Sequence, residues 1–188
     1  MTKPTETWHA APLVWGRGPV TLEIFLEPTC PFSARTFGKL DPLLAAAGED
    51  RLTVKLRLLS QPWHLVSGIV IRCILAASTT QAGREAAKAV LAAVAAHREE
   101  FEFEDHCSGP NLESTPNDIV ARIERYSGVA VAEPFQIPDL DREMKWHAKY
   151  ARQNGAHVTP TFMVDGLIAP GMSSGDSIAQ WLDALKLA

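Results

Sequence analysis

The chain has 188 residues, of which 46% are hydrophobic and 21% charged, as expected for a globular protein of one domain or one domain carrying an insertion. Its 22 acidic and 18 basic residues give a formal net charge of −4, so no basic surface indicates nucleic acid or an anionic membrane as a partner. Three cysteines are too few for a disulfide-stapled secreted scaffold, and their odd number leaves at least one thiol unpaired.

The first third of the chain predicts a strand, a helix and a second strand. Residues 20–26 are β-branched, aromatic and apolar, which indicates a strand that ends before Pro28. Apolar residues at helical spacing predict a helix over residues 31–47, and Pro42 should kink or split it. Strict alternation over residues 52–59 predicts the second strand, with its even-numbered residues on one face. The two strands should pair in parallel through a right-handed crossover.

The middle of the chain, from residue 66 to about residue 155, has helical periodicity. The clearest helix begins after Thr115, which is a good N-cap followed by Pro116, and it ends before Gly128. The stretch around Cys107 is irregular. The expected helices cover residues 69–77, 86–97, 116–127 and 139–154.

Strand chemistry returns after Gly155. Residues 161–168 predict two antiparallel strands joined by a two-residue turn at Asp165 and Gly166. A final amphipathic helix, capped near Ser174, closes the chain. We therefore predict a single α/β domain built from residues 1–64 and 156–188, with the helices of residues 65–155 inserted into it.

No targeting or membrane-spanning segment is expected. The N-terminal residues are polar, and no apolar segment with a small-residue cleavage site follows them. The longest apolar run, residues 65–77, is interrupted by Arg72 and is shorter than the roughly 20 residues that span a bilayer. We expect a cytoplasmic protein without membrane contact.

Cys30 is the strongest candidate for a reactive group. It lies between the first predicted strand and the first predicted helix, where unpaired backbone N–H groups and the helix dipole favour a thiolate. The alternative is that Cys30 is a small buried apolar residue. Cys73 falls within an apolar helix and should belong to the core. Cys107 should be exposed, and it could resolve a mixed disulfide at Cys30 only if the fold brings the two together.

Two further features support chemistry at Cys30. Ser33 stands where a Cys-x-x-Cys motif has its second thiol; it can donate a hydrogen bond to a thiolate but cannot close a disulfide. Pro160 directly precedes an apolar strand. A cis bond is plausible there and would expose the backbone of Thr159 to an extended partner, although a trans proline is also allowed at a strand's first residue.

Other polar side chains are candidates for the same site. Glu27 would raise the pKa of the Cys30 thiol or accept its proton if buried, but a polar residue at a strand end is the favoured interpretation. His64 follows the second strand at the same sheet edge and could stabilise the thiolate, although a capping or surface histidine is favoured. Trp63 is either an apolar wall for a substrate or a seal for the insert. The acidic side chains within residues 99–105, which interleave with Phe101 and Phe103, should mark a solvated edge; an acidic binding patch is the less favoured interpretation.

A zinc site is not expected, because the chain has no Cys-x-x-Cys pair and no His-x-x-x-His pair. The sequence carries no sign of oligomeric state.

The order of elements, with Cys-Pro-Phe-Ser at residues 30–33 and Val-Thr-Pro-Thr at residues 158–161, resembles the DsbA-like thioredoxin-fold family. Residues 25–33 and 161–166 also resemble bacterial proteins described as protein-disulfide isomerases. The resemblance implies a thioredoxin-like fold with a helical insertion, a nucleophile at Cys30, a second motif position at Ser33, a cis-proline at Pro160 and a partner-binding backbone at Thr159. Dithiol oxidases of the family have Cys where this chain has Ser33.

The resemblance leads to the prediction of a monothiol thiol-disulfide oxidoreductase or isomerase-like enzyme. Cys30 and Ser33 are its predicted catalytic residues, and the partner forming a mixed disulfide with Cys30 is a protein, a peptide or glutathione. No tightly bound cofactor is expected, and glutathione is the candidate co-substrate. The predicted substrate-binding residues are Pro31, Phe32, Trp63, His64, Thr159 and Pro160.

The sequence leaves two alternatives open. The first resembles the kappa-class glutathione transferases and the chromene-carboxylate isomerases, in which Ser33 or Cys30 would serve the sulfur of glutathione. The second is a non-catalytic binding module that keeps the fold and uses the edge at Pro160 to recognise a partner.

Overall fold

The computed structural model describes residues 12–102 and 111–188. Its strands are β1 (Val14–Gly16), β2 (Val20–Leu26), β3 (Leu52–Leu58), β4 (Thr161–Val164) and β5 (Leu167–Ile168). Its α-helices are α1 (Pro31–Phe37), α2 (Leu40–Ala47), α3 (Ser67–Ser78), α4 (Arg84–Ala96), α5 (Pro116–Ser127), α6 (Leu140–Gln153) and α7 (Ile178–Ala184). Two short 3-10 helices, Arg98–Glu100 and Pro134–Gln136, complete the described elements.

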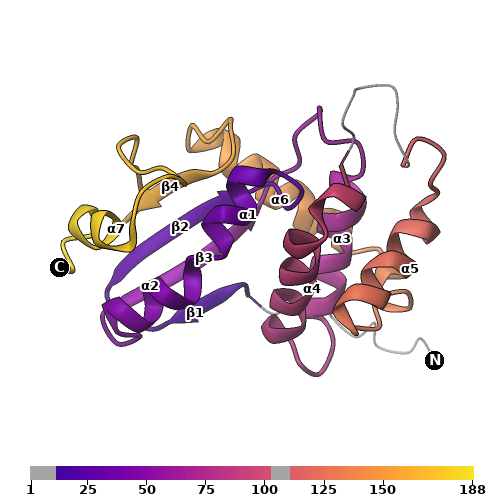
Figure 1. Cartoon of the computed structure of the whole chain (residues 1–188), viewed down its shortest axis with the longest axis horizontal. Helices are drawn as coiled ribbons and strands as arrows, with labels where there is room; N and C mark the ends of the chain where they lie inside the picture. Colours follow the sequence, from indigo (N-terminus) through magenta and orange to yellow (C-terminus); the bar gives the residue numbers. More distant parts are fainter. Residues whose placement is uncertain (1–11, 103–110) are drawn as a thin grey trace, which may run out of the picture.

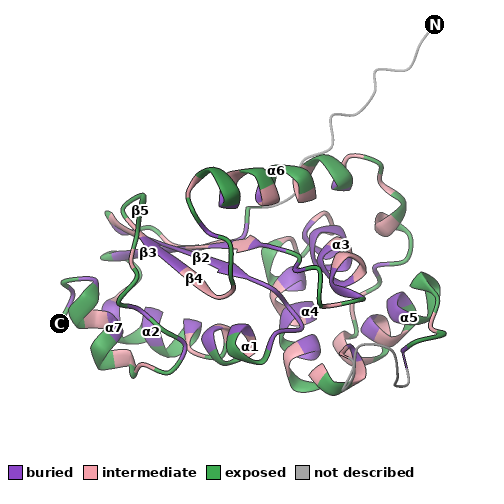
Figure 2. Ribbon diagram, turned by 90° about the horizontal axis from the view of Figure 1, so that it is seen from above, coloured by how far each residue is buried: buried purple, intermediate pink, exposed green. Residues whose placement is uncertain are grey.

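One mixed sheet organises the molecule, and it confirms the predicted α/β class. Its strand order is β1-β3-β2-β4-β5; β2 and β3 are parallel, and all the other pairs are antiparallel. β3 alternates between buried and partly exposed residues as predicted, whereas the last five residues of the central strand β2 are all buried. Helices α1, α2 and α7 cover one face of the sheet, and α6 covers the other (Figure 2). The sheet edge strand β1 was not predicted, because three residues are too few to show a period.

The predicted helix over residues 31–47 is split into α1 and α2. The break falls at Gly38 and Lys39, and Pro42 is the third residue of α2. Proline costs no hydrogen bond there, because the backbone N–H groups of a helix's first turn have no partner within the helix. The split that Pro42 predicted is therefore found.

Helices α3, α4, α5 and α6 lie between β3 and β4 in the chain (Figure 1). The first three gather beside the sheet and share its largest cluster of buried apolar side chains, which runs from Leu22 and Val54 in the sheet to Ile74, Leu91 and Ile119 in the helices. α5 begins with the predicted cap at Thr115. The helices therefore extend the core of the sheet and do not enclose a separate one within the described residues.

The C-terminal elements agree with prediction except at one cap. Asp165 and Gly166 form the predicted turn between β4 and β5, both with positive φ. The last helix is capped by Ser177, in a reciprocal pair with Gln180, so the predicted cap near Ser174 is wrong. In the part of the chain described here, no helix is long and apolar enough to cross a membrane.

Candidate active site

Cys30 lies at the junction of β2 and α1, as the sequence predicted. Its backbone N–H donates to the carbonyl of Glu27 at 3.1 Å, and its carbonyl accepts from the N–H of Ala34 at 2.9 Å, the first hydrogen bond of α1. Pro31 follows as the first residue of α1. These bonds hold the thiol at the N-terminal turn of the helix, with the residue only 5% exposed.

Ser33, in the second motif position, is a buried residue of the first turn of α1. It is 1% exposed, and its Oγ accepts a hydrogen bond from the backbone N–H of Glu27 at 3.2 Å. Hydrogen bonding by the same hydroxyl contributes to lowering the pKa of Cys30. Ser33 therefore meets the thiolate from the protein interior and is covered from solvent.

Cys30 faces the segment before β4 across the active-site surface. Its Sγ donates to the carbonyl of Thr159 at 3.8 Å, across 129 positions of sequence. The peptide bond between Thr159 and Pro160 is cis. Antiparallel pairing of β2 with β4, in which Phe25 is opposite Thr161, brings the two segments together.

His64 comes from the loop after β3 and packs behind Cys30. Its Nδ1 lies 3.3 Å from Glu27 Oε2 and 2.9 Å from Thr29 Oγ1, and its side chain is only 7% exposed. The interpretation of His64 as a surface or capping residue is therefore wrong. Parallel strands end at the same sheet edge, so β3 delivers His64 beside the end of β2.

Glu27 is fully buried, so its interpretation as an ordinary polar residue at a strand end is also wrong. Its Oε2 accepts a hydrogen bond from the Thr29 hydroxyl at 2.8 Å, and its Oε1 has no hydrogen-bond partner among the described residues. Thr29, which links Glu27 to His64, was not singled out from the sequence. Its only signal there was its place directly before Cys30.

The contacts around Cys30 lower its pKa below the ordinary value. Burial raises the pKa, but hydrogen bonding with His64, with the backbone N–H groups of Ser33 and Phe32, and with the Ser33 hydroxyl outweighs burial. The pKa of His64 is raised: burial lowers it, but the interaction with Cys30 and the negative charge of Glu27 outweigh burial. The two shifts favour a thiolate and an imidazolium side by side.

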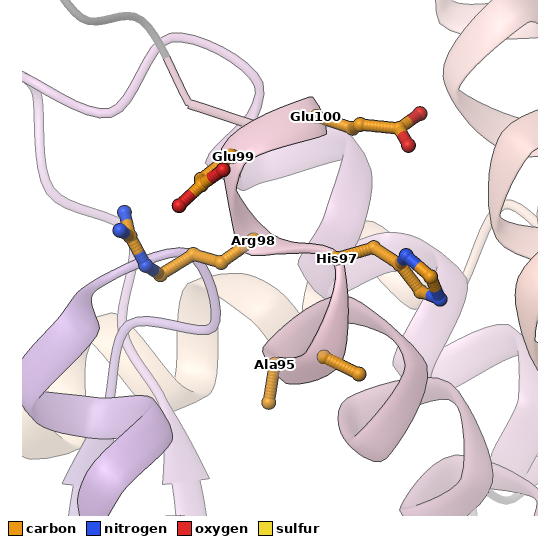
Figure 3. Close-up of a pocket in the computed structure, with 6 residues that line it drawn as sticks. Ala95, His97, Arg98, Glu99 and Glu100 are labelled. Atoms are coloured by element: carbon orange, nitrogen blue, oxygen red, sulfur yellow. The ribbon is translucent and has the colours of Figure 1, made fainter.

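The acidic stretch after α4 approaches this site and is not simply a solvated edge. Glu102 pairs with Arg98, and its Oε1 lies 3.8 Å from His64 Nδ1. Figure 3 shows the pocket at the end of α4, where Arg98 and His97 extend in opposite directions. His97 stacks on Tyr126 at 3.8 Å between ring centroids. Residues Ala95–Glu100 line the pocket and include none of the residues around Cys30.

Exposed apolar side chains adjoin the site in sequence. Phe32 follows the nucleophile by two positions, Trp63 precedes His64, and Val158 precedes Thr159; they are 52%, 56% and 62% exposed. Pro31 is also exposed, whereas Thr159 and Pro160 are partly exposed. Phe103, Glu104, Asp105 and Cys107 lie outside the described residues, so resolution by Cys107 stays a prediction. Within residues 12–102 and 111–188, no group of three or more His, Cys, Asp or Glu side chains could hold a metal ion.

The two described cysteines should differ sharply in reactivity. Cys73 is fully buried in α3, where burial raises its pKa to about 12, as expected for a core residue. Because only the thiolate reacts, iodoacetamide should label Cys30 with a rate that rises through a midpoint below the ordinary thiol pKa of about 8.5 and then levels off. Cys73 should react about a thousandfold more slowly, or not at all. Peptide mass spectrometry across a pH series measures both rates; a Cys30 midpoint at or above about 8.5 would contradict the assignment.

A thiol at a strand-to-helix turn, facing a cis-proline segment in an α/β fold with inserted helices, defines the DsbA-like class of thioredoxin-fold proteins. The chain belongs to this DsbA-like thioredoxin-fold family. It is 64% identical to a Pseudomonas syringae protein described as a "putative protein-disulfide isomerase", with 92% of this chain and 97% of that chain covered and a TM-score of 0.90.

More distant structures share the fold. A thioredoxin-like oxidoreductase from Silicibacter pomeroyi is 21% identical, with 94% of this chain and 90% of that chain covered and a TM-score of 0.67. DsbA2 from Pseudomonas aeruginosa is 17% identical, with 96% of each chain covered and a TM-score of 0.67. No protein-family model and no curated protein sequence matches the chain.

Proposed function

We propose that the protein is a monothiol thiol-disulfide oxidoreductase in which Cys30 forms a mixed disulfide with a protein, a peptide or glutathione. The observation that carries this proposal is the contact of Cys30 Sγ with the carbonyl of Thr159, beside the cis-proline, for a thiol whose pKa is lowered by hydrogen bonding with His64. His64 favours the thiolate that attacks, and Thr159 offers backbone beside it for an extended partner. The description of the 64% identical relative as a disulfide isomerase supports the same chemistry.

The reaction proceeds by two exchanges. The Cys30 thiolate attacks one sulfur of a disulfide, forming a Cys30–partner disulfide and expelling the other sulfur as a thiolate. A second thiolate, such as that of glutathione, then attacks the partner's sulfur and releases Cys30. The external thiol is oxidised and the original disulfide is reduced, while the enzyme is unchanged. Ser33 cannot perform the second attack, because a hydroxyl forms no disulfide.

A monothiol enzyme of this kind needs a continuous supply of reducing thiol. Glutathione is abundant in reducing compartments, so we place the reaction in the cytoplasm, with glutathione as co-substrate and without a tightly bound cofactor. Phe32, Trp63 and Val158 offer apolar contact to the rest of the partner.

The buried position of Ser33 favours this reaction over transferase chemistry based on that serine. Its hydroxyl is covered and already accepts the N–H of Glu27, so an incoming glutathione sulfur would meet Cys30 first. A site built only to bind partners has no need of a thiol whose pKa is lowered by several hydrogen bonds.

Reduction of a glutathionylated peptide by glutathione tests the proposal. The wild-type protein should accelerate release of the peptide thiol at pH 6.5, where an ordinary thiol is only about 1% ionised. A Cys30–glutathione adduct should be visible by mass spectrometry during turnover. Saturable glutathione binding by calorimetry, with no disulfide reduction and no adduct, would instead support the transferase-like alternative.

A further inference from the structure

Glu27, Thr29 and His64 form a cluster of largely buried polar side chains near Cys30. Stabilising a thiolate would need His64 alone, so the two further residues call for another role. We propose that His64 carries protons to and from the reacting sulfurs, and that Glu27 is the positioning residue that holds His64 for this task. The proposal deepens, and rests on, the thiol-disulfide exchange proposed above. It assigns the three side chains Cys30, His64 and Glu27 to one proton-transfer unit drawn from the end of β2, the turn before α1 and the loop after β3.

The hydrogen bonds around His64 determine which nitrogen faces the thiol. The single hydrogen of the Thr29 hydroxyl is donated to Glu27 Oε2 at 2.8 Å, so Thr29 Oγ1 acts as an acceptor toward His64 Nδ1 at 2.9 Å. Glu27 Oε2, 3.3 Å from the same nitrogen, is also an acceptor. Nδ1 therefore carries a hydrogen, and Nε2 is the nitrogen left to exchange a proton with Cys30.

The carboxylate of Glu27 is suited to hold an imidazolium in a buried place. Glu27 is fully buried, its Oε1 has no hydrogen-bond partner among the described residues, and its charge is directed at His64. Glu102 faces His64 from the stretch after α4, but that carboxylate is partly exposed and already paired with Arg98. Glu27 is thus the unshared buried charge that favours the protonated ring.

The proton steps balance the two exchanges. When the Cys30 thiolate attacks a disulfide, the proton on His64 Nε2 passes to the expelled thiolate, leaving a free thiol and a neutral ring. When glutathione enters, neutral His64 takes the proton from its thiol, and the resulting thiolate attacks the partner's sulfur. Cys30 leaves as a thiolate beside the imidazolium, and the starting state is restored.

Glu27 could change the reactivity of Cys30 in two opposite directions, so the direction observed tests whether Glu27 acts through His64. A carboxylate acting directly on a thiolate repels it, so neutralising Glu27 would make Cys30 more reactive at low pH. A carboxylate acting through His64 has the reverse effect, because without it the imidazolium that stabilises the thiolate is lost. Hydrogen bonding with His64 is the strongest of the effects that lower the pKa of Cys30, and the charge of Glu27 raises the pKa of His64.

The experiment follows alkylation of the Cys30 peptide against pH, and single-turnover discharge of a Cys30–glutathione adduct by glutathione. Glu27→Gln should slow alkylation at pH 6.5 by about tenfold, equivalent to one pKa unit, and should match the wild type near pH 10. Discharge at pH 6.5 should slow by a similar factor. In a His64→Ala background, Glu27→Gln should lose its slowing effect.

Glu23→Gln is the matched control. Glu23 is also a buried carboxylate and lies in β2, but its partners are Arg57 and Tyr150, away from the contacts that join Glu27 to His64. The pH dependence of Cys30 alkylation in Glu23→Gln should therefore match that of the wild type. If circular dichroism shows that Glu27→Gln does not fold, Thr29→Val carries the test, because it removes the hydroxyl that joins Glu27 to His64.

The outcomes separate this proposal from the proposed function. Alkylation that is unchanged or faster at pH 6.5 in Glu27→Gln overturns the positioning role. Slower alkylation with unchanged adduct discharge overturns the proton transfer. A wild-type protein that forms no adduct with any disulfide removes the exchange reaction and the proton transfer with it, and the alkylation profiles still decide whether Glu27 acts through His64.

Discussion

Replacing Cys30 with serine is expected to abolish disulfide reduction, lowering the rate by at least about a thousandfold. Serine has the size of cysteine and fits a site that is only 5% exposed, so the loss will report chemistry and not unfolding. A hydroxyl is essentially never ionised at neutral pH and forms no disulfide, which removes both the attack and the covalent intermediate.

A mixed-disulfide trap measures this loss directly. The wild-type protein is incubated with cell extract under oxidising conditions, and the proteins released by reductant are identified. The same partners should be absent from the Cys30→Ser sample. Cys73→Ala, which removes a buried thiol with a pKa of about 12, should capture them as the wild type does. Equal capture by Cys30→Ser would place the reactive thiol elsewhere in the chain.

Replacing Ser33 with cysteine is expected to change the type of reaction. Residues three positions apart at the start of a helix lie close enough for a disulfide, whose Cα atoms are about 5.5 Å apart. The new thiol should attack the mixed disulfide at Cys30, release the partner and close an internal bond without glutathione. The Cys30 adduct that persists in the wild type should therefore vanish in Ser33→Cys before any external thiol is added.

The substitution has a modest structural cost and a clear readout. Ser33 Oγ accepts the backbone N–H of Glu27, and a thiol is a weaker acceptor, so stability should fall by about 1 kcal/mol. Thiol titration should show two fewer free thiols in the oxidised variant than in the same variant after reduction. Ser33→Ala is the control, since it loses the same hydrogen bond without gaining a thiol. Persistence of the adduct in Ser33→Cys would show that a thiol at position 33 cannot reach it.

Much of the fold could be predicted because local patterns and global packing agree. Alternation over residues 52–58 produces a strand with one buried face, and Pro42 divides the helices where it was expected to. The misses have local causes. β1 has only three residues, and the cap of α7 at Ser177 competed with other serines in the same stretch. Neither leaves a clear pattern in a single sequence.

The site was only partly predictable, because its polar partners come from separate segments. Cys30, Ser33 and Pro160 carry local signals, since each occupies a special place at the start of a helix or strand. Glu27 and His64 look like surface residues in the sequence, and only the parallel pairing of β2 with β3 buries them against each other. The secondary-structure propensity of Glu27 describes its backbone. It carries no information about His64, 37 positions further along the chain, whose ring lies beside the Glu27 carboxylate.

One hydrogen bond gives the site a further property. Gln61 Nε2, in the loop that leads into the helices, donates to the carbonyl of His157, in the segment that leads out of them, at 3.1 Å. This bond joins the segment in which the chain leaves the sheet, which carries Trp63 and His64, to the segment in which it returns, which carries Val158 and Thr159. In the proposed reaction, a partner lying across Cys30 would contact both segments. The bond between Gln61 and His157 therefore helps to fix the spacing between His64 and the backbone of Thr159, independently of the helices that separate the two segments in the chain.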